Sequence, residues 1–113
     1  VDMSELFNPD VFISIHVNSN VNDSPNGIET HYYKDNSLFL AKCVHAALLN
    51  NINANDRGLF KSKFYVINHT TAPAILVEMG FLSNPQERAS LMSESRRAAT
   101  AKAIAEGIDE YFK

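Results

Sequence analysis

The stretch Ala74-Ile75-Leu76-Val77-Glu78 decides the fold, because it is a continuously apolar run of strand length that stops on a carboxylate. A second run, Val11-Phe12-Ile13-Ser14-Ile15, stops in the same way on His16. Strands this apolar are usually buried on both faces, as in the parallel sheets of α/β folds, and such sheets bind ligands at the carboxyl ends of their strands. We therefore expect His16 and Glu78 to lie at the same edge of one sheet.

An imidazole that can bind a metal and a carboxylate that can accept a proton from water are the minimal parts of a metal-dependent hydrolase. The residues alone leave a second interpretation open. A single histidine at a strand end is more often a hydrogen-bonded structural residue, and Glu78 could be an ordinary charge where a strand meets water. Against that, Glu78 follows the most apolar run in the chain and precedes Gly80, which lets other backbone approach closely.

The remaining patterns predict an α/β fold with a mostly parallel (mixed) sheet of about four strands and helices packed on it. Besides the two runs above, β-branched and aromatic residues favour strands at 28–33 and 64–67. Helical spacing and capping residues favour helices at 38–50, 85–92 and 94–112. Ser37 is the predicted N-cap of the first helix, and Asn84 with Pro85 begins the second.

Composition fits one compact unit. The chain has 113 residues, 45% of them hydrophobic, and a formal net charge of −3. An acidic balance provides no basic patch for nucleic acid. No apolar run approaches the roughly 20 residues of a membrane span, and the start has no signal-peptide pattern. The single cysteine, Cys43, lies among apolar residues and is expected to be a small buried side chain.

Four motifs follow one another along the chain: Ser14-Ile15-His16-Val17-Asn18, Gly27-Ile28-Glu29-Thr30, Arg57-Gly58-Leu59 and the twelve-residue stretch from Pro73 to Asn84. In this order they resemble the motifs of the zinc-dependent N-acetylmuramoyl-L-alanine amidases, the Amidase_3 family. The resemblance spans nearly the whole chain. It implies that His16 is a zinc ligand and that Glu78 is the catalytic carboxylate.

Members of this family supply two further zinc ligands, a histidine in a Gly-His-Gly type segment and then a glutamate, both before the Ser-Ile-His motif. This chain begins at Val1, fifteen residues before His16. We therefore expect residues 1–113 to be a single unit, the carboxyl-terminal portion of an amidase catalytic domain, with the remaining zinc ligands upstream of Val1. The sheet would then be truncated at its amino end, and its exposed edge could self-associate.

Three further residues are candidates for substrate binding. Asn18 follows the Ser-Ile-His motif directly. Glu29 shares one strand face with His31 and Tyr33, a face that lines a substrate groove or is simply solvated; both interpretations stay open. Arg57 could hold a substrate carboxylate with two parallel hydrogen bonds, or could brace a loop through a salt bridge.

The resemblance implies a peptidoglycan hydrolase, of the autolysin type, that cleaves the amide between N-acetylmuramic acid and L-alanine of the stem peptide. Its partner would be peptidoglycan or a muropeptide, and its location the bacterial cell envelope or the exterior. The alternative is a catalytically silent wall-binding or regulatory module that has lost the complete metal site.

Overall fold

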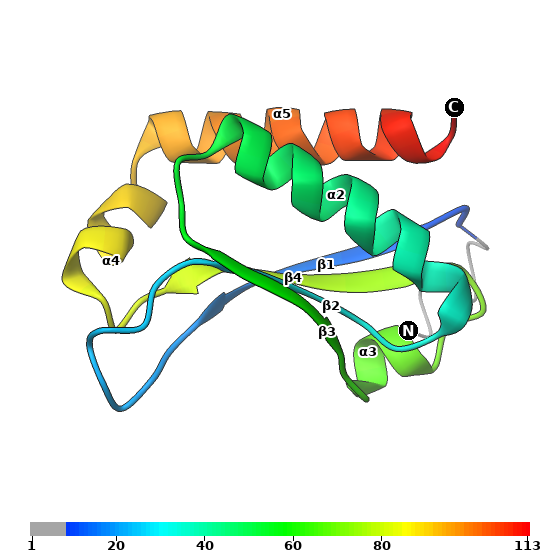
Figure 1. Ribbon diagram of the computed structural model, residues 1–113, viewed down its shortest axis with the longest axis horizontal. Helices are drawn as coiled ribbons and strands as arrows, with labels where there is room; N and C mark the ends of the chain where they lie inside the picture. The colour runs from blue at the N-terminus through cyan, green and yellow to red at the C-terminus, as the bar shows by residue number, and fades with distance from the viewer. Residues whose placement is uncertain (1–8) are drawn as a thin grey trace.

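Four strands form one mixed sheet in this computed structural model, which describes residues 9–113 (Figure 1). The strands are β1 (Phe12–Asn18), β2 (Ile28–Tyr32), β3 (Asp56–Lys61) and β4 (Ala74–Phe81). They lie in the order β1-β4-β2-β3. β1 runs parallel to β4 and β2 parallel to β3, whereas β2 and β4 are antiparallel. The predicted α/β class with a mixed sheet is confirmed.

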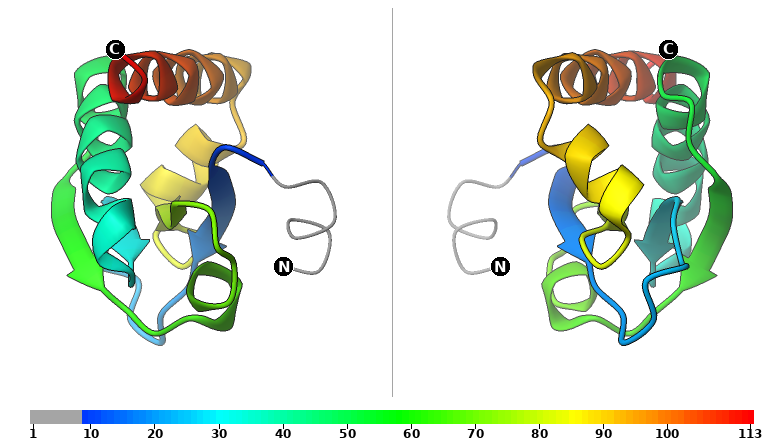
Figure 2. Two further views of the ribbon diagram at one scale, coloured as in Figure 1. Left: turned by 90° about the vertical axis from the view of Figure 1, so that its right-hand side faces the viewer. Right: turned by 90° about the vertical axis from the view of Figure 1, so that its left-hand side faces the viewer.

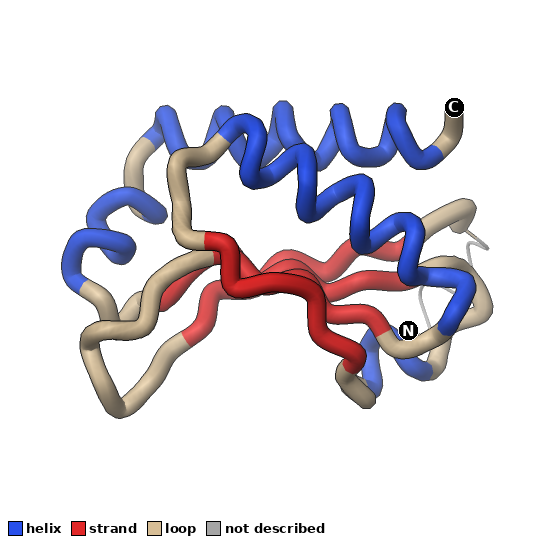
Figure 3. Tube along the Cα trace, in the orientation of Figure 1, coloured by secondary structure: helices blue, strands red, loops and turns tan. Residues whose placement is uncertain are grey.

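Two long helices cover one face of this sheet. They are α2 (Leu38–Asn51), which follows the short 3-10 turn η1 (Asp35–Ser37), and α5 (Glu94–Tyr111). The short helix α3 (Tyr65–Asn68) lies on the opposite side, and α4 (Pro85–Leu91) leads from β4 into α5 (Figures 2 and 3). The predicted helices at 38–50, 85–92 and 94–112 all form, with ends within two residues of the expected ones. As predicted, Asn84 caps α4 by accepting a hydrogen bond from the Glu87 N–H.

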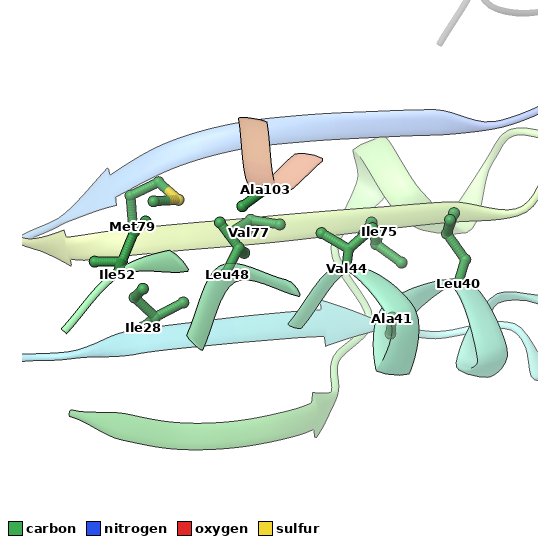
Figure 4. Close-up of a cluster of buried hydrophobic side chains, with 10 residues drawn as sticks. All are labelled: Ile28, Leu40, Ala41, Val44, Leu48, Ile52, Ile75, Val77, Met79 and Ala103. Carbon is green, nitrogen blue, oxygen red and sulfur yellow. The ribbon is translucent and has the colours of Figure 1, made fainter. Parts of the chain in front are cut away.

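The main core lies between the sheet and the two long helices. Alternate residues of β4, Ile75, Val77 and Met79, point toward α2 (Figure 4). The intervening residues Ala74 and Leu76 face the other way and pack with Ile67 of α3 in a second cluster. β4 is thus buried on both faces, which explains why its sequence is a nearly continuous apolar run.

The third predicted strand is wrong. Residues 64–67 were expected to be extended, but Tyr65–Asn68 forms the single helical turn α3, and the third strand is Asp56–Lys61. A short apolar run does not distinguish a strand from a buried helical turn. The segment from Asp56 to Gly58 has the composition of a helix stop, yet Gly58 accommodates a φ of +96° and the strand pairs with β2 through Leu59 and Phe60.

Ser37 does not cap α2 with its side chain, contrary to the expectation. Its Oγ instead accepts a hydrogen bond from the backbone N–H of Ala74 at 2.9 Å. The fully buried hydroxyl therefore joins the start of α2 to the start of β4.

β1 is an edge strand, since β4 is the one neighbour it has among the described strands. Its Ile15 and Val17 side chains are 54% and 49% exposed. An apolar strand with unpaired backbone groups is a template for association with another chain. The exposed apolar edge expected from the sequence is therefore present in the described part of the molecule.

We predict that this polypeptide self-associates as its concentration rises, and that Ile15→Lys shifts it toward monomer. A charge on an edge strand opposes edge-to-edge pairing. Light scattering coupled to size-exclusion chromatography would measure the effect, with Lys102→Gln on exposed α5 as the control. A wild-type polypeptide that stays monomeric throughout the concentration series would contradict the prediction.

A second prediction concerns the contact between α2 and α5. A Cβ built on Gly107 would lie 2.7 Å from the Cα of Val44, so the helices touch through this glycine. Helix propensity alone would make Gly107→Ala stabilising by about 1 kcal/mol. Overpacking costs about 1–3 kcal/mol and acts in the opposite direction, so we expect a net loss of up to about 2 kcal/mol.

Urea unfolding of Gly107→Ala would measure this loss. The exposed Ala101→Gly substitution on the same helix serves as a control for propensity. A gain in stability for Gly107→Ala would show that the helices separate without cost.

Candidate functional site

His16, Glu78 and Glu29 form a row across three neighbouring strands. His16 of β1 is the register partner of Glu78 in β4, and Glu78 is in turn the partner of Glu29 in β2. Residues paired in this way project from the same face of a sheet, with neighbouring strands about 4.8 Å apart. The structure therefore brings together the two residues that ended the apolar runs.

This row lies on the face of the sheet opposite α2 and α5. Val77 and Met79, which flank Glu78 in sequence, both point into the core beneath α2 (Figure 4). Because side chains alternate along a strand, Glu78 points the other way. Both strands continue past these residues, to Asn18 and Phe81. The site therefore lies on the face of the sheet, whereas the sequence predicted it at the strand ends.

The His16 imidazole is exposed. Its Nε2 makes a hydrogen bond of 2.8 Å with Ser14 Oγ, two residues earlier on the same face of β1. This contact orients the ring.

The Glu78 carboxylate is half-buried, and its Oε2 is buried without a hydrogen-bond partner among the described residues. Burial raises the pKa of the Glu78 carboxyl above its ordinary value, and the nearby Glu29 carboxylate raises the pKa further. His16 and His31 act in the opposite direction without cancelling the effect. A carboxylate with raised proton affinity suits a general base that acts near neutral pH.

Glu29 is a buried ion-paired residue, with 7% of its surface exposed. Its Oε1 accepts from His31 Nε2 at 2.8 Å, and its Oε2 accepts from Arg57 Nε at 2.8 Å. Burial acts to raise the pKa of Glu29, but the hydrogen bonds from Arg57 and His31 outweigh burial and hold the pKa below its ordinary value. Glu29 is therefore an anion beside Glu78, and the solvated alternative for this face is wrong at Glu29.

His31 extends this network away from Glu78. Its Nδ1 makes a hydrogen bond of 2.7 Å with Ser62 Oγ, and its ring stacks on Phe60 with centroids 5.1 Å apart. Both ring nitrogens of His31 therefore have hydrogen-bond partners. The sequence does indicate that His31 lies near Glu29, because side chains alternate along a strand and these two residues share one face of β2.

Arg57 lies at the other side of Glu29. Its guanidinium covers the Phe81 ring, with Cζ 4.8 Å from the ring centroid, and its side chain is 34% exposed. A salt bridge was one of the two alternatives that the sequence left open for Arg57, and the structure shows one, although it joins β3 to Glu29 of β2 and braces no loop. Phe81 was missed as a neighbour of the site, since nothing in the sequence connects it with Arg57.

Asn18 does not project a free amide oxygen toward the row. Its Oδ1 accepts from the N–H of Ser19 at 2.8 Å, and its backbone carbonyl accepts from Leu82 N–H. A register irregularity between His16 and Asn18 separates it from the regular ladder. In this structure Asn18 ends β1 and starts the following loop.

The end of β4 is held by Glu87 of α4. A Cβ on Gly80 would lie 2.7 Å from the Glu87 carboxyl carbon, so Gly80 makes room for this side chain. The buried Glu87 carboxylate accepts hydrogen bonds from Gly27 N–H at 2.9 and 3.0 Å and from Phe81 N–H at 2.6 Å. The close approach expected at Gly80 is thus made by a carboxylate of the same chain.

These residues fit part of a zinc site. His16 offers one imidazole nitrogen, and the unpartnered Glu78 oxygen can accept a proton from a water held beside it. Catalytic zinc usually has three protein ligands and a water. Residues 9–113 contain no group of three or more histidine, cysteine, aspartate or glutamate side chains arranged to hold a metal ion.

Comparisons of the sequence and of the structure with known proteins point to the same family. The sequence model described as N-acetylmuramoyl-L-alanine amidase matches residues 1–110. The chain is 40% identical over 107 residues to the uncharacterised protein YqiI of Bacillus subtilis, and 36% identical over 108 residues to the N-acetylmuramoyl-L-alanine amidase LytC of the same organism. These matches cover 91% and 92% of this chain but 52% and 22% of the relatives.

Solved structures agree with this result. The catalytic domain of CwlV, an N-acetylmuramoyl-L-alanine amidase from Paenibacillus polymyxa, superposes with a TM-score of 0.96 at 39% identity. The amidase AmiC2 of Nostoc punctiforme superposes with a TM-score of 0.94 at 38% identity. Each match covers 99% of this chain and 63% of the other, so the chain spans about half or less of the relatives and under two thirds of these solved chains.

We predict that Glu78→Gln stabilises the fold at neutral pH. A carboxyl whose pKa is raised in the folded state destabilises that state above the folded pKa, and this penalty vanishes below the unfolded pKa. The amide carries no charge and avoids the penalty. The melting temperature of the variant should exceed that of the wild type at pH 7 and converge with it as the pH falls below about 4.

Thermal melts from pH 3 to pH 8 would measure the difference. Asp109→Asn, which removes an exposed carboxylate from α5, is the matched control and should show no such convergence. A Glu78→Gln variant that is less stable than the wild type at pH 7 would show that the Glu78 carboxylate does not destabilise the folded state.

Proposed function

Since the chain belongs to the N-acetylmuramoyl-L-alanine amidase family, we propose that the protein is a peptidoglycan hydrolase that cleaves the amide between N-acetylmuramic acid and L-alanine of the stem peptide. The observation that carries the proposal is the pairing of His16 with Glu78 on one face of the sheet. A half-buried carboxylate with an unpartnered oxygen, next to an exposed imidazole, is suited to hydrolysis with a metal.

In the proposed reaction His16 is one of the zinc ligands and Glu78 is the general base. Bound zinc would supply a Lewis acid that polarises the amide carbonyl and lowers the pKa of water. Glu78 would accept the proton of the attacking water and pass it to the leaving amine of L-alanine. The raised pKa of Glu78 supports both transfers, because a stronger base accepts the proton and a neutral acid then returns it.

We further propose that residues 1–113 are the carboxyl-terminal portion of an amidase catalytic domain. The support is the 99% coverage of this chain against 63% coverage of the solved amidases. The remaining zinc ligands would then come from residues upstream of Val1. Glu29 and Arg57 would border the substrate, with Asn18 at the start of the adjoining loop.

The relatives also support a place of action. Several are named probable cell wall amidases, among them LytH of Staphylococcus saprophyticus, 33% identical over 103 residues. Among the described residues, no helix has the length and apolar character needed to cross a membrane. The proposed location is the bacterial cell envelope or the exterior, with peptidoglycan as the partner.

We predict that this chain alone binds zinc weakly and releases no peptide, because one imidazole is too few ligands. The polypeptide extended by its upstream residues should do both. In the extended form, Glu78→Gln should lower amide cleavage by about 10²–10⁴-fold, the usual contribution of a general base, and retain zinc. His16→Ala should lose zinc and activity together.

Cleavage of a purified muropeptide, with zinc content measured in parallel, tests these expectations, and Asp109→Asn is the control. Loss of zinc in Glu78→Gln would make Glu78 a ligand, and full activity in that variant would remove it from the mechanism. An extended wild type that binds muropeptide without cleaving it would favour the silent binding module.

A further inference from the structure

Two neighbouring side chains hold Arg57 in place without using its terminal amino groups. Its Nε donates to the buried Glu29 carboxylate, and the face of its guanidinium lies over the buried Phe81 ring. These two contacts hold the plane of the guanidinium. The side chain of Arg57 has therefore lost most of its rotational freedom before any ligand arrives, which lowers the entropic cost of binding.

The two terminal amino groups, Nη1 and Nη2, form the edge of the guanidinium that we call its outer edge. Arginine has five N–H donors, and Nε provides one of them. Among residues 9–113, no side chain or carbonyl accepts from Nη1 or Nη2, while about a third of the side chain is exposed. Nη1 and Nη2 offer two parallel donors in one plane, which match the two oxygens of a carboxylate.

Glu29 holds Arg57 through one of its two oxygens, because the other oxygen accepts a hydrogen bond from His31. The contact is therefore not the two-bonded form that arginine makes with a carboxylate, and a ligand carboxylate can make that pair with Nη1 and Nη2. Lysine would not offer the same fit, because its ammonium is a point charge without the planar fork.

Arg57 lies close to the proposed reaction centre. Glu29, which holds Arg57, is the direct register partner of Glu78. One strand spacing of roughly 5 Å separates these two residues, and the Arg57 guanidinium lies a hydrogen bond of 2.8 Å beyond Glu29. An extended peptide advances about 3.4 Å per residue, so a carboxylate about two residues beyond the cleaved bond would reach the outer edge of Arg57.

We propose that Arg57 binds a free carboxylate on the second residue of the stem peptide, and that Glu29 is the positioning residue that orients Arg57 for this contact. The inference rests on the proposed function for the identity of the substrate. The glycan part of a muropeptide offers hydroxyl and acetamido groups, whereas the stem peptide offers carboxylates. The enzyme thus distinguishes stems with this carboxylate free from stems in which it is amidated.

The test compares two muropeptides that differ in one group, the free carboxylate or the primary amide at the second stem residue. The extended wild-type polypeptide should cleave the free form with a kcat/KM about tenfold higher, mainly through a lower KM, because a charged hydrogen-bonded pair is lost with the amide. This comparison needs no variant. Equal kcat/KM values would overturn the proposal.

The variants assign the preference to a residue. Arg57→Gln should bring the ratio of the two kcat/KM values close to one, and Arg57→Lys should retain only a small part of the preference. Lys102→Gln, which removes an exposed positive charge from α5, should keep the wild-type ratio. If Arg57→Gln does not fold, as judged by circular dichroism, Arg57→Lys decides; an intact preference in either folded variant overturns the assignment to Arg57.

Direct binding separates this inference from the proposed activity. Titration calorimetry of the present chain with the two free stem peptides should give tighter binding of the carboxylate form, and this difference should disappear in Arg57→Gln. If the extended polypeptide cleaves neither muropeptide while the binding preference persists, the proposed function fails and the assignment of Arg57 stands. If cleavage occurs without any preference, the proposed function stands and the inference fails.

Discussion

The buried carboxylate of Glu87 is the interaction on which the site depends. It accepts hydrogen bonds from the backbone N–H groups of Gly27 and Phe81, which immediately precede β2 and end β4. These two points are far apart in sequence, and a single anion clamps them together. Because β2 and β4 are antiparallel, this clamp sets the register that places Glu29 opposite Glu78. Removing it would leave two buried donors unpaired as well as freeing the loop.

The helical layer supports β4 from the other side. Arg96 of α5 donates to the Met79 carbonyl at 2.7 Å, and the Ser37 hydroxyl at the start of α2 accepts from Ala74. Both ends of β4 are therefore bonded to the helices that cover it. The strand that carries the candidate base is rigid in this sense, whereas β1, with its exposed outer edge, provides the histidine.

Sequence patterns predicted the class, three of the four strands and all three longer helices, because these elements depend on local periodicity and caps. The strand from Asp56 to Lys61 was missed because its first residues resemble a helix stop, and its pairing with β2 is a tertiary effect. His16 and Glu78 were predicted to lie close together because each ends an apolar run, and the pairing of β1 with β4 confirms that placement. The partners of Arg57 were not predictable, since Glu29 and Phe81 lie 28 and 24 residues away along the chain, and only the folded sheet brings them together.

The two-sided burial of β4 has a consequence for how the family can change. Its odd-numbered residues from Ile75 to Met79 fill the core, and Glu78 occupies the alternate face. Inserting or deleting one residue before Glu78 would turn the carboxylate into the apolar layer and expose the valine beside it. The apolar core therefore tolerates substitutions in this strand better than insertions or deletions, and the demand for a folded core by itself preserves the position of Glu78.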